Sequence, residues 1–567
     1  MACEDRFFCR ASDLLAFVLG KQDACPTARG TSSPVKRPPQ GLSTDLAAWV
    51  ELFRLRTGRA PRILHIGNIA NNGYNNAKLL NRAGFDCDTL CYDYYHIMSC
   101  PEWEDADYTG DIRSDNYPSW QCVDLRGFER PRWFAQGPAQ LCMKYLIARR
   151  EGKAPEADKL WNELVSQRET TCARLRGDIP PPTRMERFLV LSGKAIRKFW
   201  KLPYILAQRT PIGRKLYWAL AGRTFRKRVR ELCEQFSVLF PDRPDKLRPI
   251  ELQDFGFQHA LWVELIGHYD VVVGYATDGI YPLLAGNVPY VAFEHGTIRN
   301  IPFQPTLQGR LCALTYCQSD VAFITNCDNN IAAEKLKIPN YKWVPHPINE
   351  DEHPTTRPDQ VRAKLRERLK SDFVLFHPSR HHWSPSRNTD WDKGNDILIE
   401  GFARFVREVN PRAGAVFVEW GLTLAESKAL IAKNGIEKNI LWIQPQPTPR
   451  MNAYIQAADV LADQFCIGTF GGIMPKGLLF GTPNMIYLDE SVHKWCLPEF
   501  PPILNTRTPD DVFAALKRLY EEPGYAKQIS DSGIEWYAKH HSSQVVADAF
   551  AEAVRDTTSG GPTEIPK

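Results

Sequence analysis

The chain has 567 residues, of which 43% are hydrophobic and 24% charged, and its formal net charge is +5. This composition is typical of a soluble globular protein, and the length suits two domains with insertions. The fifteen cysteines are scattered without a CxxC pair or a Cys/His cluster with zinc spacing, which argues against a disulfide framework and against a structural metal site.

Residues 1–58 are predicted to form an N-terminal extension, partly mobile because it includes a loop rich in Pro, Ser, Gly and Thr. Glu4 and Asp5 stand where a signal peptide carries positive charge. No segment of the sequence is apolar for long enough to span a membrane. We therefore expect a cytoplasmic protein.

A first Rossmann-like domain is predicted over residues 59–348. It begins with a strand, RILHIG, a loop of small residues, a helix and a second strand, CDTLCYD, as Rossmann-like halves do. The loop lacks the spacing of the dinucleotide fingerprint, so NAD binding is not expected. Glycines let a ligand approach the backbone, and asparagine amides can bond sugar hydroxyls; the alternative is a plain strand–helix turn. The loop residues that could meet a ligand are Gly67, Asn68, Asn71, Asn72 and Gly73.

Residues of about 95–250 interrupt this pattern and are predicted to form a helical, basic insertion. Between Arg184 and Arg230 there are fourteen Lys and Arg and one acidic residue, Glu186. Bulky apolar and aromatic side chains are mixed with these cations, which favours contact with anionic lipid. Nucleic acid fits less well because no nucleic-acid motif accompanies the cations, and a solvated helical face without a partner is the remaining alternative. The predicted location is thus cytoplasmic, with residues 184–230 on the inner face of the membrane.

Three further strands, in YDVVVGYA, PYVAFE and DVAFITN, complete the first domain. The second of them ends at Glu294-His295-Gly296. This places His295 at the carboxyl edge of the sheet, where open α/β sheets bind ligands. A single histidine is more often structural, but this position, with Glu294 beside it, makes His295 a candidate functional residue.

A second Rossmann-like domain is predicted over residues 349–535, followed by a C-terminal helix and polar tail over 536–567. Its first strand, FVLFHP, leads through a polar loop to a helix that opens at Lys393. Arg380 and Lys393 are therefore expected beside a helix N-terminus, where N–H groups and the helix dipole already favour an anion. Two cations suit a pyrophosphate; the alternative is a pair of solvated surface charges.

A second glycine loop, with Gly468, Gly471 and Gly472, precedes the helix that holds Pro475 and offers a similar anion site. No metal site is expected. The sequence Asp390-Trp391-Asp392 mimics a metal-binding DxD motif but precedes a helix, and the spacing of the histidines at 377, 381 and 382 fits no common site.

Two Rossmann-like halves joined by a linker, each with a ligand loop at its carboxyl edge, resemble the GT-B fold of nucleotide-sugar glycosyltransferases. Arg380 after a strand, Lys393-Gly394 at a helix start, and the segments NILWIQPQPTPRMNAYIQAADVLAD and CIGTFGGIMPKGLLFGTPNMIYLD are similar to the motifs of retaining family 4. The resemblance covers about residues 60–90 and 265–535. It implies an α/β protein with two Rossmann-like domains facing a central cleft. It also implies a nucleotide-sugar donor, a saccharide or lipid-linked acceptor, retention of configuration, a place in glycan or cell-surface polysaccharide biosynthesis, and no metal or other cofactor.

The resemblance also implies roles for individual residues. His295, Arg380 and Lys393 would be catalytic. The donor-binding residues would be Arg380, Lys393, Gly394, Gln444, Asp463, Gln464, Gly468, Gly471, Gly472 and Lys476. The acceptor-side residues would be Gly67, Asn68, Asn71, Asn72, Gly73 and Glu294.

The sequence departs from the family at its two signature glutamates, which fall on Gly468 and Lys476. In the family the second glutamate binds ribose hydroxyls, and a lysine cannot accept a hydrogen bond. Ribose recognition must therefore differ, with Asp463 and Gln464 as candidate acceptors. Two other functions stay open: a GT-B scaffold protein that has lost donor binding, and a GT-B enzyme of another reaction type, such as a sugar-nucleotide epimerase or a phosphorylase.

Overall fold

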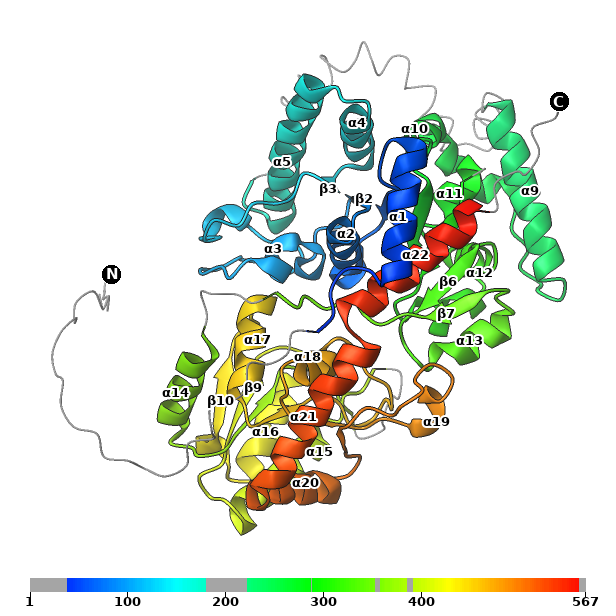
Figure 1. Ribbon diagram of the computed structural model, residues 1–567. Helices are drawn as coiled ribbons and strands as arrows, with labels where there is room; N and C mark the ends of the chain where they lie inside the picture. Colours follow the sequence, from blue (N-terminus) through cyan, green and yellow to red (C-terminus); the bar gives the residue numbers. More distant parts are fainter. Residues whose placement is uncertain (1–37, 180–221, 287, 352–356, 385–390, 560–567) are drawn as a thin grey trace, which may run out of the picture. The chain divides into compact units, whose positions relative to one another are not determined.

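The computed structural model of the protein describes residues 38–179, 222–286, 288–351, 357–384 and 391–559. Most of the predicted N-terminal extension and most of the basic stretch between Arg184 and Arg230 lie outside the described residues. Two parallel β-sheets, of seven and six strands, alternate with helices along the chain (Figure 1). We call the part built on the seven-stranded sheet the first lobe and the part built on the six-stranded sheet the second lobe.

The first sheet has the strand order β3-β2-β1-β4-β5-β6-β7. The order reverses between β1 and β4, where doubly wound sheets bind ligands beyond the carboxyl ends of their strands. Helices cover both faces: Ile63 of β1 packs with α1, α2 and α22, whereas Leu64 packs with α4 and α10. Most strands are therefore apolar on both sides. The strand bounds are Arg62–Ile66 (β1), Asp86–Tyr92 (β2), Phe134–Gly137 (β3), Val271–Tyr275 (β4), Tyr290–Phe293 (β5), Val321–Ile324 (β6) and Tyr341–Trp343 (β7).

The α-helices described between residues 44 and 336 belong to this lobe, and the last helix of the described residues joins them. Their bounds are Thr44–Thr57 (α1), Asn72–Arg82 (α2), Pro101–Asp105 (α3), Ala139–Arg150 (α4), Ala154–Arg176 (α5), Arg223–Leu239 (α9), His259–Ile266 (α10), Ile280–Ala285 (α11), Leu307–Cys317 (α12), Asn329–Leu336 (α13) and Ser543–Ser559 (α22).

The second sheet has the order β10-β9-β8-β11-β12-β13, which reverses between β8 and β11. Its strands are Val374–His377 (β8), Gly414–Val418 (β9), Ile440–Ile443 (β10), Val460–Ala462 (β11), Asn484–Ile486 (β12) and Leu504–Asn505 (β13). Its helices are Pro358–Leu369 (α14), Asn395–Glu408 (α15), Leu424–Lys433 (α16), Thr448–Ala457 (α17), Ile473–Leu479 (α18), Glu490–His493 (α19), Pro509–Glu521 (α20) and Pro523–His540 (α21).

Helices α15 and α20 form the most closely packed helix pair of the second lobe. Phe402 and Phe405 of α15 are fully buried in the same core cluster as Val512 and Leu516 of α20. A Cβ on Gly401 would lie 2.6 Å from the Cβ of Val512, so only a glycine allows the two helices to approach this closely. The packing fixes α15, and with it the loop that carries Lys393.

The last helix of the chain, α22, packs against the first lobe, and Figure 1 shows it in red beside α1 in blue. Val546, Ala547 and Phe550 are buried in the core that covers one face of the first sheet. The Phe550 ring lies 4.9 Å from the Phe323 ring and 6.1 Å from the Phe293 ring, centre to centre.

The stretch predicted to be a helical insertion, residues 95–250, also contains β3, which pairs with β2 and extends the first sheet. The sequence does not reveal β3 because it is only four residues long, FAQG, and lacks a run of apolar or alternating residues. Strands β7 and β13 are not predicted from the sequence for the same reason, because they have only three and two residues.

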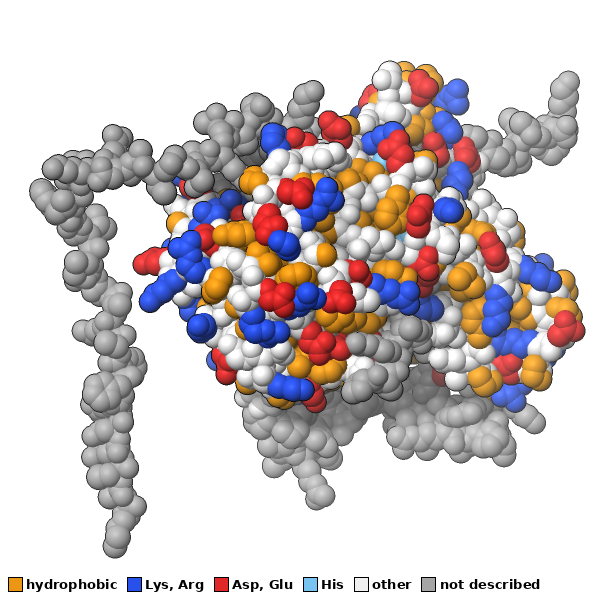
Figure 2. All heavy atoms as spheres, turned by 90° about the horizontal axis from the view of Figure 1, so that it is seen from below, with side chains coloured by type: hydrophobic (Ala, Val, Ile, Leu, Met, Phe, Trp, Pro, Cys, Tyr) orange, Lys and Arg blue, Asp and Glu red, His pale blue; other side chains and the backbone are white. Residues whose placement is uncertain are grey.

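Charges of both signs mix on the face of the molecule drawn in Figure 2, where Lys and Arg lie among Asp and Glu. In the described part of the chain, no helix is both long enough and apolar enough to cross a lipid bilayer.

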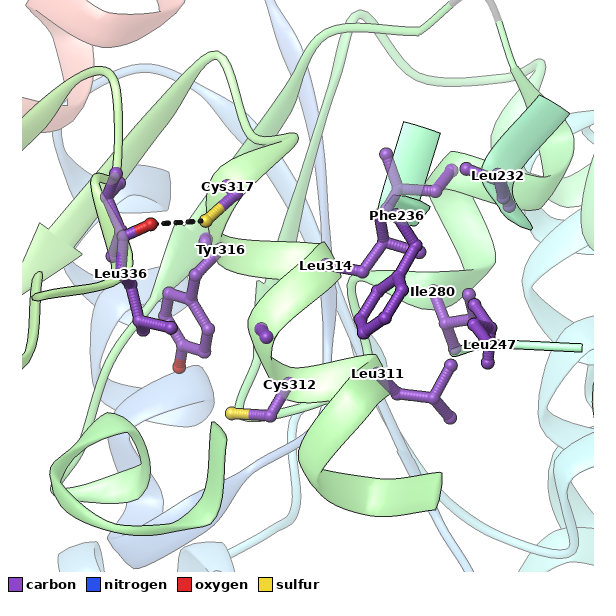
Figure 3. Packing of buried hydrophobic residues seen from close by; sticks show 14 of the residues in the cluster. Leu232, Phe236, Leu247, Ile280, Leu311, Cys312, Leu314, Tyr316, Cys317 and Leu336 are labelled. Atoms are coloured by element: carbon purple, nitrogen blue, oxygen red, sulfur yellow. Dashed lines mark hydrogen bonds between the residues drawn. The ribbon is translucent and has the colours of Figure 1, made fainter. Parts of the chain in front are cut away.

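Helix α9 follows the undescribed part of the basic stretch and is anchored to the first lobe by one apolar face. Phe225, Val229, Leu232 and Phe236 are buried in a cluster with α11 and α12. Figure 3 shows Phe236 of α9 beside Leu311 and Leu314 of α12. The opposite face of α9 therefore carries the polar and charged residues of this amphipathic helix.

Candidate functional site

A cavity of about 390 Å³ is lined by residues of both lobes. This volume is in the range of sites that enclose small-molecule ligands. Its lining comes mainly from loops that follow the carboxyl ends of strands in both sheets, as expected for open α/β sheets. The lining residues on which the argument rests are Asn71, Asn72, Glu104, His295, Arg299, His346, Arg380, Lys393, Trp420, Pro445, Gln446, Thr448, Asp463, Gly471, Gly472 and Lys476.

Two Rossmann-like lobes thus share one ligand cleft at the carboxyl ends of their strands. This is the GT-B fold. The α/β class and the two-lobed GT-B architecture predicted from the sequence are confirmed.

The loop between β8 and α15 brings Arg380 and Lys393 to the cleft of the GT-B fold. Gly394 is the N-cap of α15, and its φ of 69° lies in the left-handed region that favours glycine. Lys393 therefore stands immediately before the helix start, where the helix dipole favours an anion. The guanidinium of Arg380 lies 5.9 Å from the centre of the Trp420 ring.

The Lys393 side chain is partly buried in the wall of the cavity. Its Nζ donates a hydrogen bond to Gln464 Oε1 over 2.5 Å. Burial lowers the pKa of Lys393, the Asp463 carboxylate opposes this effect, and the nearby cations Arg380 and Arg299 lower the pKa further. Three cations therefore act on one part of the cavity, so a bound anion would relieve their mutual repulsion.

Arg299 is a site residue that the sequence analysis missed. It ends a short 3₁₀ helix, Thr297–Arg299, and its guanidinium donates to both carboxylate oxygens of Asp328 over 2.7 and 3.0 Å. Because Asp328 follows the next strand, β6, this ion pair holds the Arg299 side chain in place at the edge of the sheet. The available signal was a cation three residues after Gly296 in the turn beyond β5.

His295 lies in the cavity wall between Asn72 and His346. Asn72 Nδ2 is 2.9 Å from His295 Nδ1, so the amide donates to Nδ1 and the ring proton is on Nε2. The His346 ring lies edge-on to the His295 ring at 5.2 Å. Burial lowers the pKa of His295 to about 4, with Arg299 adding to the effect. The imidazole is therefore neutral at pH 7 and offers an N–H donor.

The predicted acceptor-side loop is held by a hydrogen bond within the loop and by two to the carbonyls of Ser99 and Cys100. Asn68 Nδ2 donates to Asn71 Oδ1 over 3.0 Å and to the Ser99 carbonyl over 2.8 Å, and Asn71 Nδ2 donates to the Cys100 carbonyl over 3.1 Å. Only Asn71 and Asn72 of the predicted loop residues line the cavity; Gly67, Asn68 and Gly73 do not.

Gly73 serves close packing, since a Cβ there would lie 2.4 Å from the Gly67 carbonyl oxygen. Glu294 is fully buried and does not line the cavity. Burial raises the pKa of Glu294 to about 7, against the opposing effects of Asn329 and Arg299. The structure thus places Glu294 behind His295 in the wall of the cleft.

Asp463 and Gln464, the candidate ribose acceptors, are engaged by neighbours in the second lobe. Ser379 Oγ donates to Asp463 Oδ1 over 2.6 Å; burial raises the Asp463 pKa and Lys393 lowers it. Gln464 accepts from Lys393 through Oε1 and donates through Nε2 to the Thr469 carbonyl. Asp463 lines the cavity, whereas Gln464 does not.

Of the other residues predicted to bind the donor, some line the cavity and others do not. Gly471 and Gly472 line the cavity, next to the start of α18. Gly394, Gln444 and Gly468 do not line it. Gln444 instead donates to Glu419 Oε2 over 2.5 Å.

Lys476 lines the cavity and is 7% exposed. Burial lowers the pKa of Lys476, and the Glu104 carboxylate acts against this effect. Glu104 is the second site residue that the sequence analysis missed. It comes from α3, inside the predicted insertion, and reaches the second lobe, where Thr448 Oγ1 donates to Glu104 Oε2 over 3.2 Å.

No known protein-family model matches the sequence, and no curated protein matches it. Among solved structures, Anabaena HepE in complex with UDP and glucose is similar, with 16% identity, covering 54% of this chain and 83% of HepE at a TM-score of 0.43. Sucrose-phosphate synthase from Thermosynechococcus elongatus has 13% identity, with 54% and 80% of the two chains covered and a TM-score of 0.40. A variant of S. aureus TarM in a complex that holds UDP has 11% identity, covering 52% and 58% at a TM-score of 0.38.

Proposed function

We propose that the protein is a glycosyltransferase. It moves a sugar from a nucleotide-sugar donor to a saccharide or lipid-linked acceptor, with retention of configuration, in glycan or cell-surface polysaccharide biosynthesis. The observation that carries the proposal is the group of three cations, Arg299, Arg380 and Lys393, which both lobes contribute to the cavity that His295 also lines. The retaining outcome rests on the sequence motifs around Arg380 and Lys393.

The chemistry of this group suits a leaving nucleoside diphosphate. As the glycosidic bond breaks, negative charge grows on the diphosphate, and preorganised cations in an enclosed site stabilise that charge most effectively. Lys393 is held by Gln464 and Arg299 by Asp328, so neither must reorient during the reaction. The transfer is proposed to need no metal or other cofactor.

His295 is proposed to hold the sugar. Its neutral ring, oriented by Asn72, presents an N–H that can donate to a sugar hydroxyl without repelling the cations beside it. Binding between two lobes also excludes water, which would otherwise hydrolyse the donor.

The first prediction concerns ligand binding. UDP, GDP or ADP, or one of their sugars, is expected to raise the unfolding temperature, because a ligand that binds only the folded state stabilises it by about 2.7 kcal/mol at a hundred times its Kd. The matched control is the corresponding nucleoside, which lacks the diphosphate and should give little shift. A panel without any shift would contradict the proposed function.

The nucleotide sugars of this panel also distinguish a transferase from the alternative functions when turnover is measured. A transferase releases nucleoside diphosphate faster when the correct acceptor is added. A sugar-nucleotide epimerase would change the sugar without an acceptor, and a phosphorylase would need inorganic phosphate. A scaffold protein would show no turnover with any of these additions.

We also propose contact with anionic lipid through the basic stretch between Arg184 and Arg230. Its described end, on α9, carries Arg223, Arg226, Lys227 and Arg230, which line a shallow surface hollow together with Glu231 and Glu234. The Lys227 side chain is 81% exposed, and each cation near an anionic surface contributes about 1 kcal/mol to binding.

Changing these four cations to Gln is expected to weaken binding to phosphatidylserine vesicles by at least about tenfold at low salt, and by less at high salt because charges are then screened. The control variant changes four exposed cations of the second lobe: Lys517, Arg518, Lys527 and Lys539. An equal loss of vesicle binding in both variants would contradict lipid contact through α9. The absence of vesicle binding by the unchanged protein would contradict it as well.

A further inference from the structure

We propose that Glu104 of the first lobe accepts a hydrogen bond from a ribose hydroxyl of the donor nucleotide, while Lys476 of the second lobe donates to the same hydroxyl. This inference rests on the proposed function and deepens it. It accounts for recognition of the ribose although Lys476 occupies the position where the GT-B resemblance places a glutamate.

The backbone around Glu104 is fixed firmly. On one side, Glu102 forms a buried ion pair with Arg130, with contacts of 2.7 to 3.0 Å. On the other side, Asp105 accepts hydrogen bonds from Tyr74 over 2.5 Å and from Lys78 over 2.8 Å. Since Glu102 and Asp105, which lie on either side of Glu104 in α3, are tied to the first lobe, the Glu104 side chain projects into the cavity from a rigid support.

The Glu104 carboxylate has capacity left for a ligand. Its Oε2 accepts from Thr448, but Oε1 receives no hydrogen bond from the described part of the protein. The residue is 7% exposed. Because Glu104 lines the cavity, this second oxygen can accept a hydrogen bond from a ligand bound there.

Lys476 complements Glu104. Within the described ranges, its ammonium forms neither a hydrogen bond nor an ion pair with Glu104, although both line the cavity and their charges interact. A hydroxyl can donate to a carboxylate and accept from an ammonium at the same time. A sugar hydroxyl placed between the two side chains would therefore satisfy both, whereas a second carboxylate at 476 would face Glu104 with like charge.

The surroundings indicate that this hydroxyl belongs to ribose. Arg380 and Lys393 offer the cationic end of the cavity to phosphates. The lining from Trp420, Pro445 and Gln446 combines apolar side chains with an amide, which suits a base. Thr448 lies two residues after Gln446 and donates a hydrogen bond to Glu104. Ribose joins base to phosphate, so it must pass this part of the cavity.

The test measures binding of the nucleoside diphosphate among UDP, GDP and ADP that binds best, together with its 2′-deoxy and 3′-deoxy analogues, by titration calorimetry. The unchanged protein is expected to prefer the ribonucleotide over at least one deoxy analogue by about tenfold or more, as for a hydrogen bond to a charged group. Glu104→Gln is expected to bring that preference to within about twofold. Lys476→Met, an independent variant of similar side-chain volume, should reduce the preference too.

The control is Asp107→Asn. Asp107 also joins the lobes, since Arg450 donates to it over 2.6 and 3.0 Å, but it does not line the cavity. The Asp107→Asn variant should lower the affinity for the ribonucleotide and for its deoxy analogues equally, so the preference for the ribonucleotide should stay unchanged.

Full preference in both Glu104→Gln and Lys476→Met would overturn the inference while leaving the proposed function in place. Equal loss of preference in Asp107→Asn would overturn it as well, because the effect would then come from lobe contact alone. If the unchanged protein binds no nucleoside diphosphate, the proposed function itself fails, and this inference with it.

Discussion

Replacing Lys393 with Met is expected to lower kcat/KM for sugar transfer by at least about a hundredfold. Removal of one preorganised group that stabilises developing charge typically costs about 10² to 10³ in rate. Lys393 lies in the cavity wall just before α15 and is held by Gln464, so its charge is already in place where negative charge would develop. Met keeps most of the side-chain volume, which separates the loss of charge from the loss of packing.

The control is Lys428→Met in the same lobe. Lys428 also forms a side-chain contact, donating to Glu419 over 2.6 Å, but it does not line the cavity. Its kcat/KM should stay within about twofold of the unchanged protein. Steady-state kinetics give kcat/KM for both variants. A Lys393→Met enzyme as active as the Lys428→Met enzyme would contradict the role proposed for the cations.

Replacing Arg130 with Met is expected to lower the free energy of unfolding by about 3 to 5 kcal/mol, because it leaves the Glu102 carboxylate buried without its cation. The side chains of Arg130 and Glu102 are only 6% and 4% exposed. Since Glu102 supports α3, the variant should also weaken nucleotide binding through Glu104. Equilibrium denaturation in urea measures the loss of stability.

Two further variants make this result specific. Arg132→Met breaks a neighbouring pair with Asp158 in which the side chains are 49% and 62% exposed, and exposed pairs typically contribute no more than about 1 kcal/mol. The double change Arg130→Met with Glu102→Leu should recover most of the stability, because removing both buried charges avoids the unpaired one. A double variant as unstable as Arg130→Met would refute this explanation.

Much of the fold could be predicted because its central strands are long, apolar and bounded by turns. VVVGY in β4 and GAVFV in β9 are wholly buried, and such runs are distinctive in a sequence. The short strands β3, β7 and β13 carry no such signal, since their place is set by pairing with neighbours and not by their own residues.

The candidate site was predictable only where its residues are marked by local sequence. Arg380 and Lys393 follow a buried strand and precede a helix, so their proximity could be inferred. Glu104 could not be found this way, because its contact with Thr448 joins residues 344 positions apart. Asn68 shows the opposite error: the sequence cannot tell whether an amide faces a ligand or bonds to its own loop.

The position of α22 has a consequence for biosynthesis. The ribosome releases the strands of the seven-stranded sheet early, yet Phe293 and Phe323 stay uncovered until Phe550 has left the exit tunnel. The intervening lobe, from α14 to α21, is continuous in the chain and can close its own core beforehand. Packing of the first lobe is therefore completed only after the second lobe has been synthesised, and the nascent protein exposes this apolar surface until α22 emerges.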